Sequence, residues 1–245
     1  MVHAVAHHAL SLNDRVMRAL DRIEYRQAVR PQDRDQIFNL RYHAYLREAA
    51  IAPSADERFT DPVDEQPNCL VFGVYADGEL AGAIRLSVSG EGMPQVPTAK
   101  VFPETVLPLI EAGRVLVDPT RFVADARWSR ELPELAYLTL RLPWLAMEHF
   151  GADIMLAAVR PEHYPFYRRL WGNTVLSPPR LYPGLAKPVM LSQLDYARAA
   201  PRVEALYPFF RARENERAAI FGESRMSWLP ASMAAGGTAR SGLTR

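Results

Sequence analysis

Cysteine is nearly absent from this sequence, because Cys69 is the only one in 245 residues. A lone cysteine excludes an intrachain disulfide and is typical of a protein from a reducing compartment. Apolar runs long enough to cross a bilayer are also missing, and residues 1–8 lack the charged and hydrophobic regions of a signal peptide. These absences predict a soluble, cytoplasmic protein without a transmembrane segment.

An excess of charge of one sign is absent as well, since the formal net charge is +1 at pH 7. The sequence therefore has no overall electrostatic footprint for nucleic acid, and any charged partner has to meet a local patch. His3, His7 and His8 cluster near the N-terminus without a matching group of cysteines or acids. We expect a solvated terminal cluster there and no metal site.

Glycine is missing from two places where nucleotide-binding folds use it. No glycine-rich turn follows the first predicted strand, Tyr25–Val29, which argues against a Rossmann fold. The segment Val117–Phe150 contains no glycine at all. Helices that receive a pyrophosphate often open with a glycine-rich turn, so this segment is not typical of such a site.

Apolar periodicity divides the rest of the chain into strands and helices. Asp77 and Gly78 join two β-rich runs and are favoured in a two-residue hairpin turn. Strands are predicted at Tyr25–Val29, Cys69–Ala76, Leu80–Val88, Arg114–Val117, Ile154–Val159 and Val189–Leu194. Helices are predicted through Val16, Leu20 and Ile23, from Pro31 to Leu46, over Pro133–Phe150, over Glu162–Leu170 and, interrupted by Pro208, over Arg202–Phe221.

The order of these elements predicts the fold class. With 49% hydrophobic and 23% charged residues, one large domain with appendages is expected. Strand, helix, hairpin, strand, helix, strand, helix and strand in succession are typical of an α/β (α+β) sandwich with a mixed sheet flanked by helices. We expect an N-terminal helical arm at residues 1–24, the main domain at residues 25–196, and a helical extension with a disordered tail at residues 197–245. Val101–Ile110 fits either a helix or a strand.

A candidate chemical motif begins just before the strand at Arg114–Val117. Glu111 and Arg114 are three residues apart, and the apolar run after them stops at Asp118 and Pro119. Residues three apart in a regular strand face opposite sides, so these two side chains share a cleft only if a bulge lies between them. Gly113 is well placed for such a bulge. An ordinary ion pair is the alternative interpretation.

Four features follow one another along the chain. They are the pair Arg41 and Tyr45 on the first helix of the main domain, the acids Asp61 and Asp64 before the hairpin, Arg85 in its second strand, and the Glu-x-x-Arg of Glu111 and Arg114 ahead of an apolar strand. In this order they resemble a GNAT acyltransferase domain over Tyr25–Leu194. Within that superfamily, the resemblance is to the branch that holds N-acyl amino acid synthases and acyl-homoserine lactone synthases.

The resemblance implies an N-acyltransferase that moves a long-chain acyl group from the phosphopantetheine of acyl carrier protein to the α-amine of an amino acid. No bound cofactor is expected, because the phosphopantetheine-linked donor is a substrate. A donor without a nucleotide pyrophosphate agrees with the glycine-free segment. Aminolysis of a thioester needs a neutral amine, a place for the oxyanion and an exit for the thiol.

These needs assign expected roles to the residues of the resemblance. Glu111 is the expected base, with Arg114 beside it, and N–H groups freed by a bulge would hold the oxyanion. Arg85 or Arg41 is expected to bind the amino acid carboxylate. Tyr167 is the expected acid for the leaving thiol, with a core aromatic as the alternative.

A basic patch is expected where the donor enters. In the GNAT fold this region lies around the short helix at Glu162–Leu170, and the arginines there are Arg160, Arg168, Arg169 and Arg180. Acyl carrier protein is acidic, so the resemblance makes this patch its expected docking site. A solvated helix face is the alternative.

Two other functions stay open. An acyl-homoserine lactone synthase that uses S-adenosylmethionine usually has tryptophan where this chain has Ile51, and the proline-rich loop Pro53–Pro67 also fits it poorly. A non-catalytic acyl-binding or regulatory module on the same fold is the other possibility. Separately, the alternative interpretation of Asp61 and Asp64 is that they only form turns beside Pro62.

Overall fold

A computed structural model describes residues 10–90, 92 and 96–222 of the chain. The predicted tail near Gly236 and the histidines His3, His7 and His8 lie outside these residues. In the described part of the chain, no helix is long and apolar enough to cross a membrane. The same residues contain no group of His, Cys, Asp or Glu side chains arranged to hold a metal ion.

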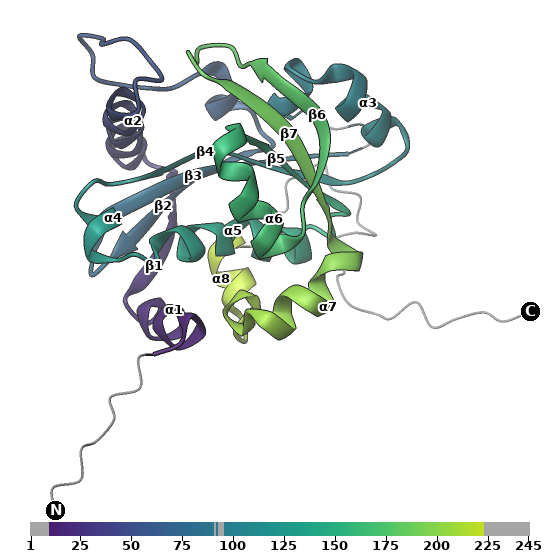
Figure 1. The fold of residues 1–245 in the computed structure, drawn as a ribbon. Helices are drawn as coiled ribbons and strands as arrows, with labels where there is room; N and C mark the ends of the chain where they lie inside the picture. Colours follow the sequence, from purple (N-terminus) through teal and green to yellow (C-terminus); the bar gives the residue numbers. More distant parts are fainter. Residues whose placement is uncertain (1–9, 91, 93–95, 223–245) are drawn as a thin grey trace, which may run out of the picture.

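A seven-stranded mixed sheet runs through the molecule in the order β1-β2-β3-β4-β5-β7-β6 (Figure 1). Neighbouring strands are antiparallel except β4 and β5, which are parallel. The strands are β1 (Ile23–Gln27), β2 (Cys69–Ala76), β3 (Glu79–Ser89), β4 (Leu116–Ala124), β5 (Ile154–Val159), β6 (Thr174–Leu181) and β7 (Pro188–Asp195). This is the mixed sheet that the sequence predicts.

Helices cover both faces of this sheet. Alternate residues of β2 show the division, because Val71 packs in the cluster under α2 while Phe72 belongs to the main core on the opposite face. The helices α2 (Pro31–Arg47) and α3 (Pro103–Glu111) lie on the first face. The main core is covered by α1 (Leu12–Leu20), α4 (Trp128–Glu131), α5 (Leu135–His149), α6 (Tyr164–Trp171), α7 (Tyr196–Leu206) and α8 (Glu216–Phe221).

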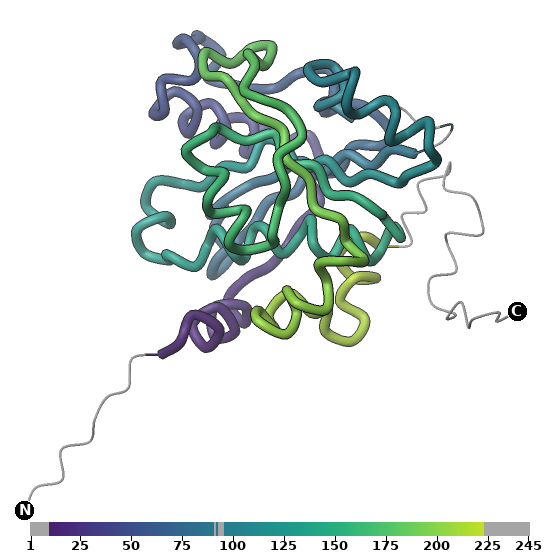
Figure 2. The backbone as a smooth tube through the Cα atoms, turned by 45° about the vertical axis from the view of Figure 1, so that its right-hand side comes forward, coloured from purple at the N-terminus to yellow at the C-terminus, as the bar shows by residue number. Residues whose placement is uncertain are grey.

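The N- and C-terminal helices pack on the main core together (Figure 2). The side chain of Asn13 in α1 donates a hydrogen bond to the Leu206 carbonyl oxygen at 3.0 Å. Arg141 of α5 is 1% exposed and donates to the carbonyl oxygens of Phe209 (2.5 Å) and Arg211 (2.7 Å), and it also forms an ion pair with Glu216. A buried guanidinium needs such partners, so this contact fixes the C-terminal segment to the core.

Most predicted elements are confirmed. The hairpin turn lies at Asp77 and Gly78, with φ of 50° and 84°, values that favour glycine and aspartate. The helix beginning at Pro31, the helix ending near Phe150 and the strand Ile154–Val159 also form as expected. Val101–Ile110, which fitted either type of element, lies largely in α3.

Two predictions about individual elements are wrong, and one strand was missed. Ile23 begins β1 instead of ending a helix, because α1 is closed by a cap at Asp21. The strand expected at Arg114–Val117 begins at Leu116 and continues through Pro119 to Ala124. Proline is tolerated there because pairing with β5 has already ended. The strand β6 was not expected, since Pro178 and Pro179 lie within it, but it is the edge of the sheet, where proline is allowed.

The strands β4 and β5 diverge almost as soon as they meet. They pair only through Leu116 with Ile154 and Val117 with Met155, although both strands continue. Further along β4, the register with β3 shifts between Ala83 and Arg85, and Arg121, with φ of 54°, lies in the resulting bulge. Beyond Val117, the backbone of β4 that faces β5 therefore has no strand partner.

Candidate active site

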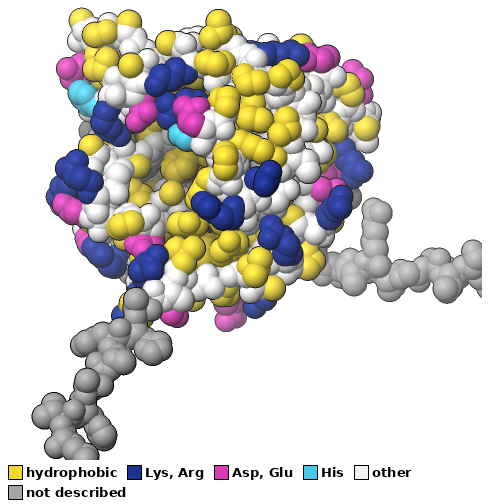
Figure 3. Space-filling model, viewed as in Figure 1, with side chains coloured by type: hydrophobic (Ala, Val, Ile, Leu, Met, Phe, Trp, Pro, Cys, Tyr) yellow, Lys and Arg dark blue, Asp and Glu magenta, His cyan; other side chains and the backbone are white. Residues whose placement is uncertain are grey.

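A pocket of about 360 Å³ occupies the space between the diverging strands. Its walls come from β4 (residues 119–124), the end of β5, the end of α2, α6 and the loop between β6 and β7. Figure 3 shows this hollow with apolar side chains inside and charged side chains around it. The volume lies within the range of roughly 300–1,000 Å³ that is common for small-molecule sites.

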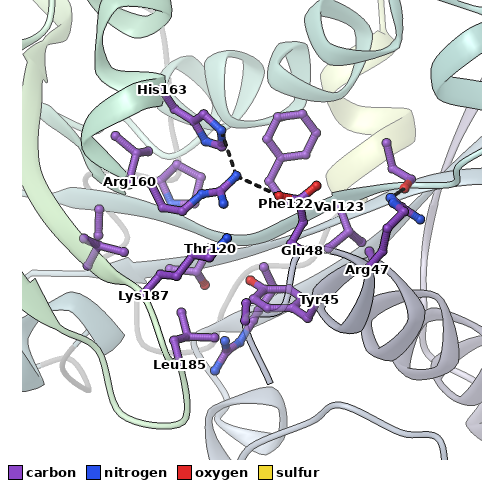
Figure 4. Close-up of a pocket in the computed structure, with 18 of the residues that line it drawn as sticks. Tyr45, Arg47, Glu48, Thr120, Phe122, Val123, Arg160, His163, Leu185 and Lys187 are labelled. Atoms are coloured by element: carbon purple, nitrogen blue, oxygen red, sulfur yellow. Dashed lines mark hydrogen bonds and ion pairs between the residues drawn. The ribbon is translucent and has the colours of Figure 1, made fainter. Parts of the chain in front are cut away.

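A chain of polar contacts crosses one side of the pocket (Figure 4). Arg160 Nη2, just after β5, donates to Glu48 Oε2 at the end of α2 (3.2 Å) and to His163 Nε2 (2.9 Å). A guanidinium group only donates, so Nε2 of His163 carries no proton in this contact. Burial and the charge of Arg160 lower the pKa of His163, which favours the same neutral imidazole.

Behind the pocket lies a cluster of three buried arginines, one buried aspartate and one half-buried aspartate. We call it the arginine cluster, and its members are Arg41, Asp61, Asp64, Arg85 and Arg121. Arg41 Nη1 lies 2.9 Å from Asp64 Oδ1, and Arg85 Nη1 lies 2.7 Å from Asp61 Oδ1. Arg121 Nη2 reaches the second oxygen of Asp61 at 2.5 Å. The cluster joins α2, β3, β4 and the loop before β2, so it fixes these elements around the pocket.

Burial of Asp61 and Asp64 raises their pKa values, but the surrounding arginines outweigh this effect. For Asp61, the charge of Arg85 and the hydrogen bond from Arg121 lower the pKa to about 2. The pKa of Asp64 is lowered in the same way by Arg41 and Arg85. Both carboxyl groups are therefore ionised at neutral pH. They also cap the short turn Pro62–Glu65, so the structural role that the sequence left open is present as well.

The arginine cluster has more donors than its two carboxylates accept. Arg41 Nε and Nη2, Arg85 Nη2 and Arg121 Nε are buried without a hydrogen-bond partner among the described residues. Asp118 is a further buried acid nearby, and burial raises its pKa while two hydrogen bonds from Thr98 oppose the increase. The wall of the pocket at Arg121 consequently has a positive character.

Three aromatic rings surround the guanidinium group of Arg121. The group lies 4.6 Å from the ring centroid of Phe59, 5.7 Å from that of Tyr45 and 5.8 Å from that of Tyr182. Cation–π contacts of this kind favour a planar guanidinium over an ammonium. Arg121 is 7% exposed and lines the pocket, so its orientation is set by Asp61 and these rings together.

The structure brings most residues of the sequence resemblance to this region. Tyr45 and Tyr167 line the pocket directly. Arg41, Asp64 and Arg85 are fully or almost fully buried in the arginine cluster and are not among the lining residues. The expectation that Arg41 or Arg85 meets a substrate carboxylate in the open pocket is therefore not supported by their placement. Their contacts reach the pocket wall only by way of the aspartates and Arg121.

Glu111 and Arg114 lie elsewhere. Glu111 ends α3 and is exposed, and Arg114 forms an ion pair with Asp153 at 3.1 Å. Neither residue lines the pocket. The bulge expected at Gly113 is also misplaced, since Gly113 with φ of 74° lies in the turn between α3 and β4 and the bulge is at Arg121. Their assignment as base and partner stays a prediction that the geometry does not favour.

The sequence contains a second acid-x-x-arginine seven residues further on. Asp118 and Arg121 have the same spacing and are followed by the apolar residues Phe122 and Val123. This pair lies within β4, beside the pocket and at the bulge. It was missed because Pro119 was interpreted as the end of the strand.

The four arginines of the expected docking patch do not form one cluster. Arg160 lines the pocket and contacts Glu48, whereas Arg180 on β6 pairs with Glu104 of α3 at 2.5 Å. Arg168 and Arg169 are exposed on α6, whose Tyr167 lines the pocket. Only the last two remain as an open basic surface beside the pocket.

Comparison with known proteins agrees with this architecture. No curated protein sequence matches the chain significantly. Among solved structures, the N-acyl amino acid synthase FeeM from uncultured soil microbes superimposes with a TM-score of 0.63 at 19% identity, covering 77% of this chain and 98% of that one. The CoA-dependent acyl-homoserine lactone synthase BjaI, solved with MTA, gives 0.54 at 16% identity, with 81% and 97% covered. The corresponding synthase MesI gives 0.52 at 17% identity, with 76% and 95% covered.

These structural likenesses show the fold, which is that of the GNAT acyltransferases. Family membership comes from the sequence. The model of the family "N-acyl amino acid synthase FeeM" matches residues 36–195, which is more than half of the chain. The matched range contains the arginine cluster and β4 to β7. The chain therefore belongs to the FeeM family of N-acyl amino acid synthases and is an acyltransferase.

Proposed function

We propose that this acyltransferase moves a long-chain acyl group from the phosphopantetheine of acyl carrier protein to the α-amine of an amino acid. The observation that carries the proposal is the pocket between β4 and β5, which combines an apolar interior with a carboxylate, a neutral imidazole and cations at its edge. Such a pocket suits an acyl chain together with a small zwitterion.

The N-terminal ends of α4 and α5, the two helices that follow β4, favour a donor without a nucleotide pyrophosphate. An anion at a helix N-terminus uses free N–H groups and the helix dipole. Asp125 Oδ1 already accepts hydrogen bonds from the backbone N–H groups of Arg127 (2.8 Å) and Trp128 (3.1 Å) at the start of α4. Glu134 precedes α5, is 8% exposed and pairs with Arg15 at 2.6 Å. A second anion would meet these carboxylates at both helix starts.

The chemistry needs a place for the charge that develops on the thioester oxygen. The bulge at Arg121 lies where β4 has left β5, so backbone N–H groups on this side of β4 have no strand partner to bind. We assign the oxyanion to this part of β4, close to the positive wall at Arg121. The negative charge of the tetrahedral intermediate is then stabilised by N–H groups and a guanidinium group that the fold has already oriented.

The proton transfers complete the reaction. Glu48 is the carboxylate among the residues that line the pocket, and we assign to it the proton of the α-ammonium group. The neutral amine attacks the thioester carbon, the C–N bond forms, and the C–S bond breaks. Tyr167 also lines the pocket, and its phenol, whose pKa burial raises, is protonated at neutral pH. The phenol donates its proton to the departing sulfur, and the phenolate takes the second proton of the attacking nitrogen, which restores the phenol. The products are an amide and a free thiol.

A product assay tests this function. The purified protein is incubated with a long-chain acyl carrier protein and an equimolar mixture of the proteinogenic amino acids, and products are measured by mass spectrometry while thiol release is followed. We expect an N-acyl amino acid ion and one thiol per amide. Thiol release without any amide, or no release above hydrolysis, would contradict the proposal. An acyl-homoserine lactone formed only with S-adenosylmethionine would assign the chain to the other activity.

A further inference from the structure

Four cations line the pocket, and three of them already have partners. Arg47 donates to the carbonyl oxygen of Ala124 at 3.2 Å. Arg121 is held by Asp61, and Arg160 by Glu48, Glu162 and His163. The fourth, Lys187, forms no hydrogen bond or ion pair with any other residue in the described ranges, although its charge acts on Glu162 and His163. Its ammonium group is the cation that the protein leaves for a ligand.

Lys187 is placed by its backbone beside the end of α2. It lies in the loop between β6 and β7, and the backbone N–H of its neighbour Ala186 donates to the carbonyl oxygen of Ala50 at 2.9 Å. Glu48 is two residues before Ala50 on the same turn of chain. Figure 4 shows Lys187, Arg160 and Glu48 reaching into the pocket from three different elements. The pocket therefore presents a free ammonium and a carboxylate from two segments that are tied together.

This arrangement matches the charges of a free amino acid. An α-amino acid carries an ammonium and a carboxylate on the same carbon at neutral pH. Glu48 can receive the first group and Lys187 the second, while the apolar interior faces the acyl chain. Arg41 and Arg85, which the sequence favours for the carboxylate, are 0% exposed and are engaged by Asp61 and Asp64.

We propose that Lys187 binds the α-carboxylate of the acceptor and thereby turns its amine toward Glu48 and the thioester. This assignment rests on the proposed function and names the acceptor class as α-amino acids with a free carboxylate. Amides, esters and simple amines with the same side chain lack the group that Lys187 binds. Since one charge-assisted contact is lost with them, they are expected to be poor acceptors.

Kinetics with matched acceptors provide the first test. The chain has two lysines, and Lys100, exposed on the turn Pro97–Lys100 outside the pocket, is the control. Lys187→Gln should raise the KM for the amino acid by about tenfold or more and leave the KM for its amide unchanged. Lys187→Arg keeps the positive charge, so it should keep most of the parent's preference for the amino acid over its amide. Lys100→Gln should change neither value. Equal effects of Lys187→Gln on amino acid and amide would overturn the proposal.

Chemical labelling tests the subsite without turnover. The protein is treated with an amine-reactive ester in the presence of N-dodecanoylglycine, which has a carboxylate but no amine, or of its methyl ester. Peptide mass spectrometry should show that the acid protects Lys187 and the methyl ester does not, with Lys100 equally labelled throughout. Equal labelling of Lys187 under both conditions would contradict the subsite. Protection in a protein that acylates no amino acid would instead keep the carboxylate subsite and contradict the proposed function.

Discussion

Arg121 Nη2 lies 2.5 Å from Asp61 Oδ2, although the two residues are sixty positions apart in the sequence. Arg121 belongs to the bulge of β4, where φ is positive, and Asp61 belongs to the loop before β2. The contact therefore joins the strained strand at the pocket to the arginine cluster behind it. A backbone bulge is maintained only when its surroundings determine it, and this ion pair is part of those surroundings.

Arg121→Lys should lower kcat/KM by about tenfold to a hundredfold, because an ammonium group keeps the charge but loses the planar contacts with Asp61 and the three rings. The matched control is Arg127→Lys, since Arg127 pairs with Glu79 on the surface just after the same strand. Steady-state kinetics with the acylated donor measure both variants. Equal values for Arg121→Lys and the parent would show that the cluster does not orient the pocket.

Acid should weaken the fold through Asp61. Its pKa is about 2 in the folded protein and 3.8 in the unfolded chain, so the folded state gains stability above about pH 4 and loses it as the pH falls toward 2. The gain is about 2 kcal/mol. Denaturant unfolding at several pH values should show that the difference between the parent and Asp61→Asn shrinks over this range. A constant difference would mean that Asp61 is not the titrating group.

Removal of one partner of the buried pair Arg41 and Asp64 should be costly. Both side chains are 0% exposed, so Asp64→Asn leaves Arg41 as an uncompensated buried charge. We expect the free energy of unfolding to fall by about 3 kcal/mol or more. Asp33→Asn, which removes a surface pair with Arg30, should reduce the stability much less, because water and salt screen this pair. Similar losses for the two variants would place Asp64 outside the stabilising cluster.

Glu48 and Glu111 give opposite predictions for the base. Glu48→Gln should lower kcat by about a hundredfold, because the variant cannot accept the proton of the ammonium group. Glu111→Gln should have activity within a few-fold of the parent, since Glu111 is exposed outside the pocket. Both variants are compared across the pH range. The reverse result would support the base that the sequence pattern suggests.

The exposed arginines of α6 are expected to meet acyl carrier protein. Replacing both Arg168 and Arg169 by Glu reverses their charge. This change should raise the apparent KM for the carrier-bound donor and weaken the dependence of that KM on salt. A short acyl-pantetheine donor should be unaffected. The control is the same reversal of Arg198 and Arg202, which are exposed on α7. Equal losses with both donors would indicate a role of α6 in folding instead.

Helices and strands were predictable from the sequence wherever a local pattern, such as a turn dipeptide or an apolar run, is enough to determine them. Asp77 and Gly78 dictate a hairpin, and Ile154–Val159 is apolar throughout, as a buried parallel strand requires. The strand β4 was not predictable in full, because Pro119 normally stops a strand and is allowed here only by the early separation from β5. That separation depends on residues far away in the sequence.

The site was predictable in its parts but not in its contacts. The sequence resemblance points to Arg41, Asp61, Asp64 and Arg85, and the structure brings these residues together. The sequence gives no sign that the two aspartates pair with these arginines. It also does not show that Arg41 and Arg85 are buried and lie away from the pocket surface. Lys187 belongs to no motif, and its position follows from a backbone hydrogen bond to Ala50.

Because only two residue pairs join β4 to β5, the sheet consists of two leaves that share a short seam. One leaf, β1 to β4, carries the arginine cluster, and the other, β5 to β7, carries Arg160 and Lys187. The helix α5 spans the seam, because it packs on β3 and β4 of the first leaf and on β5 of the second. The width of the pocket is therefore set by how α5 packs across the seam, and the two strand ladders contribute little to it.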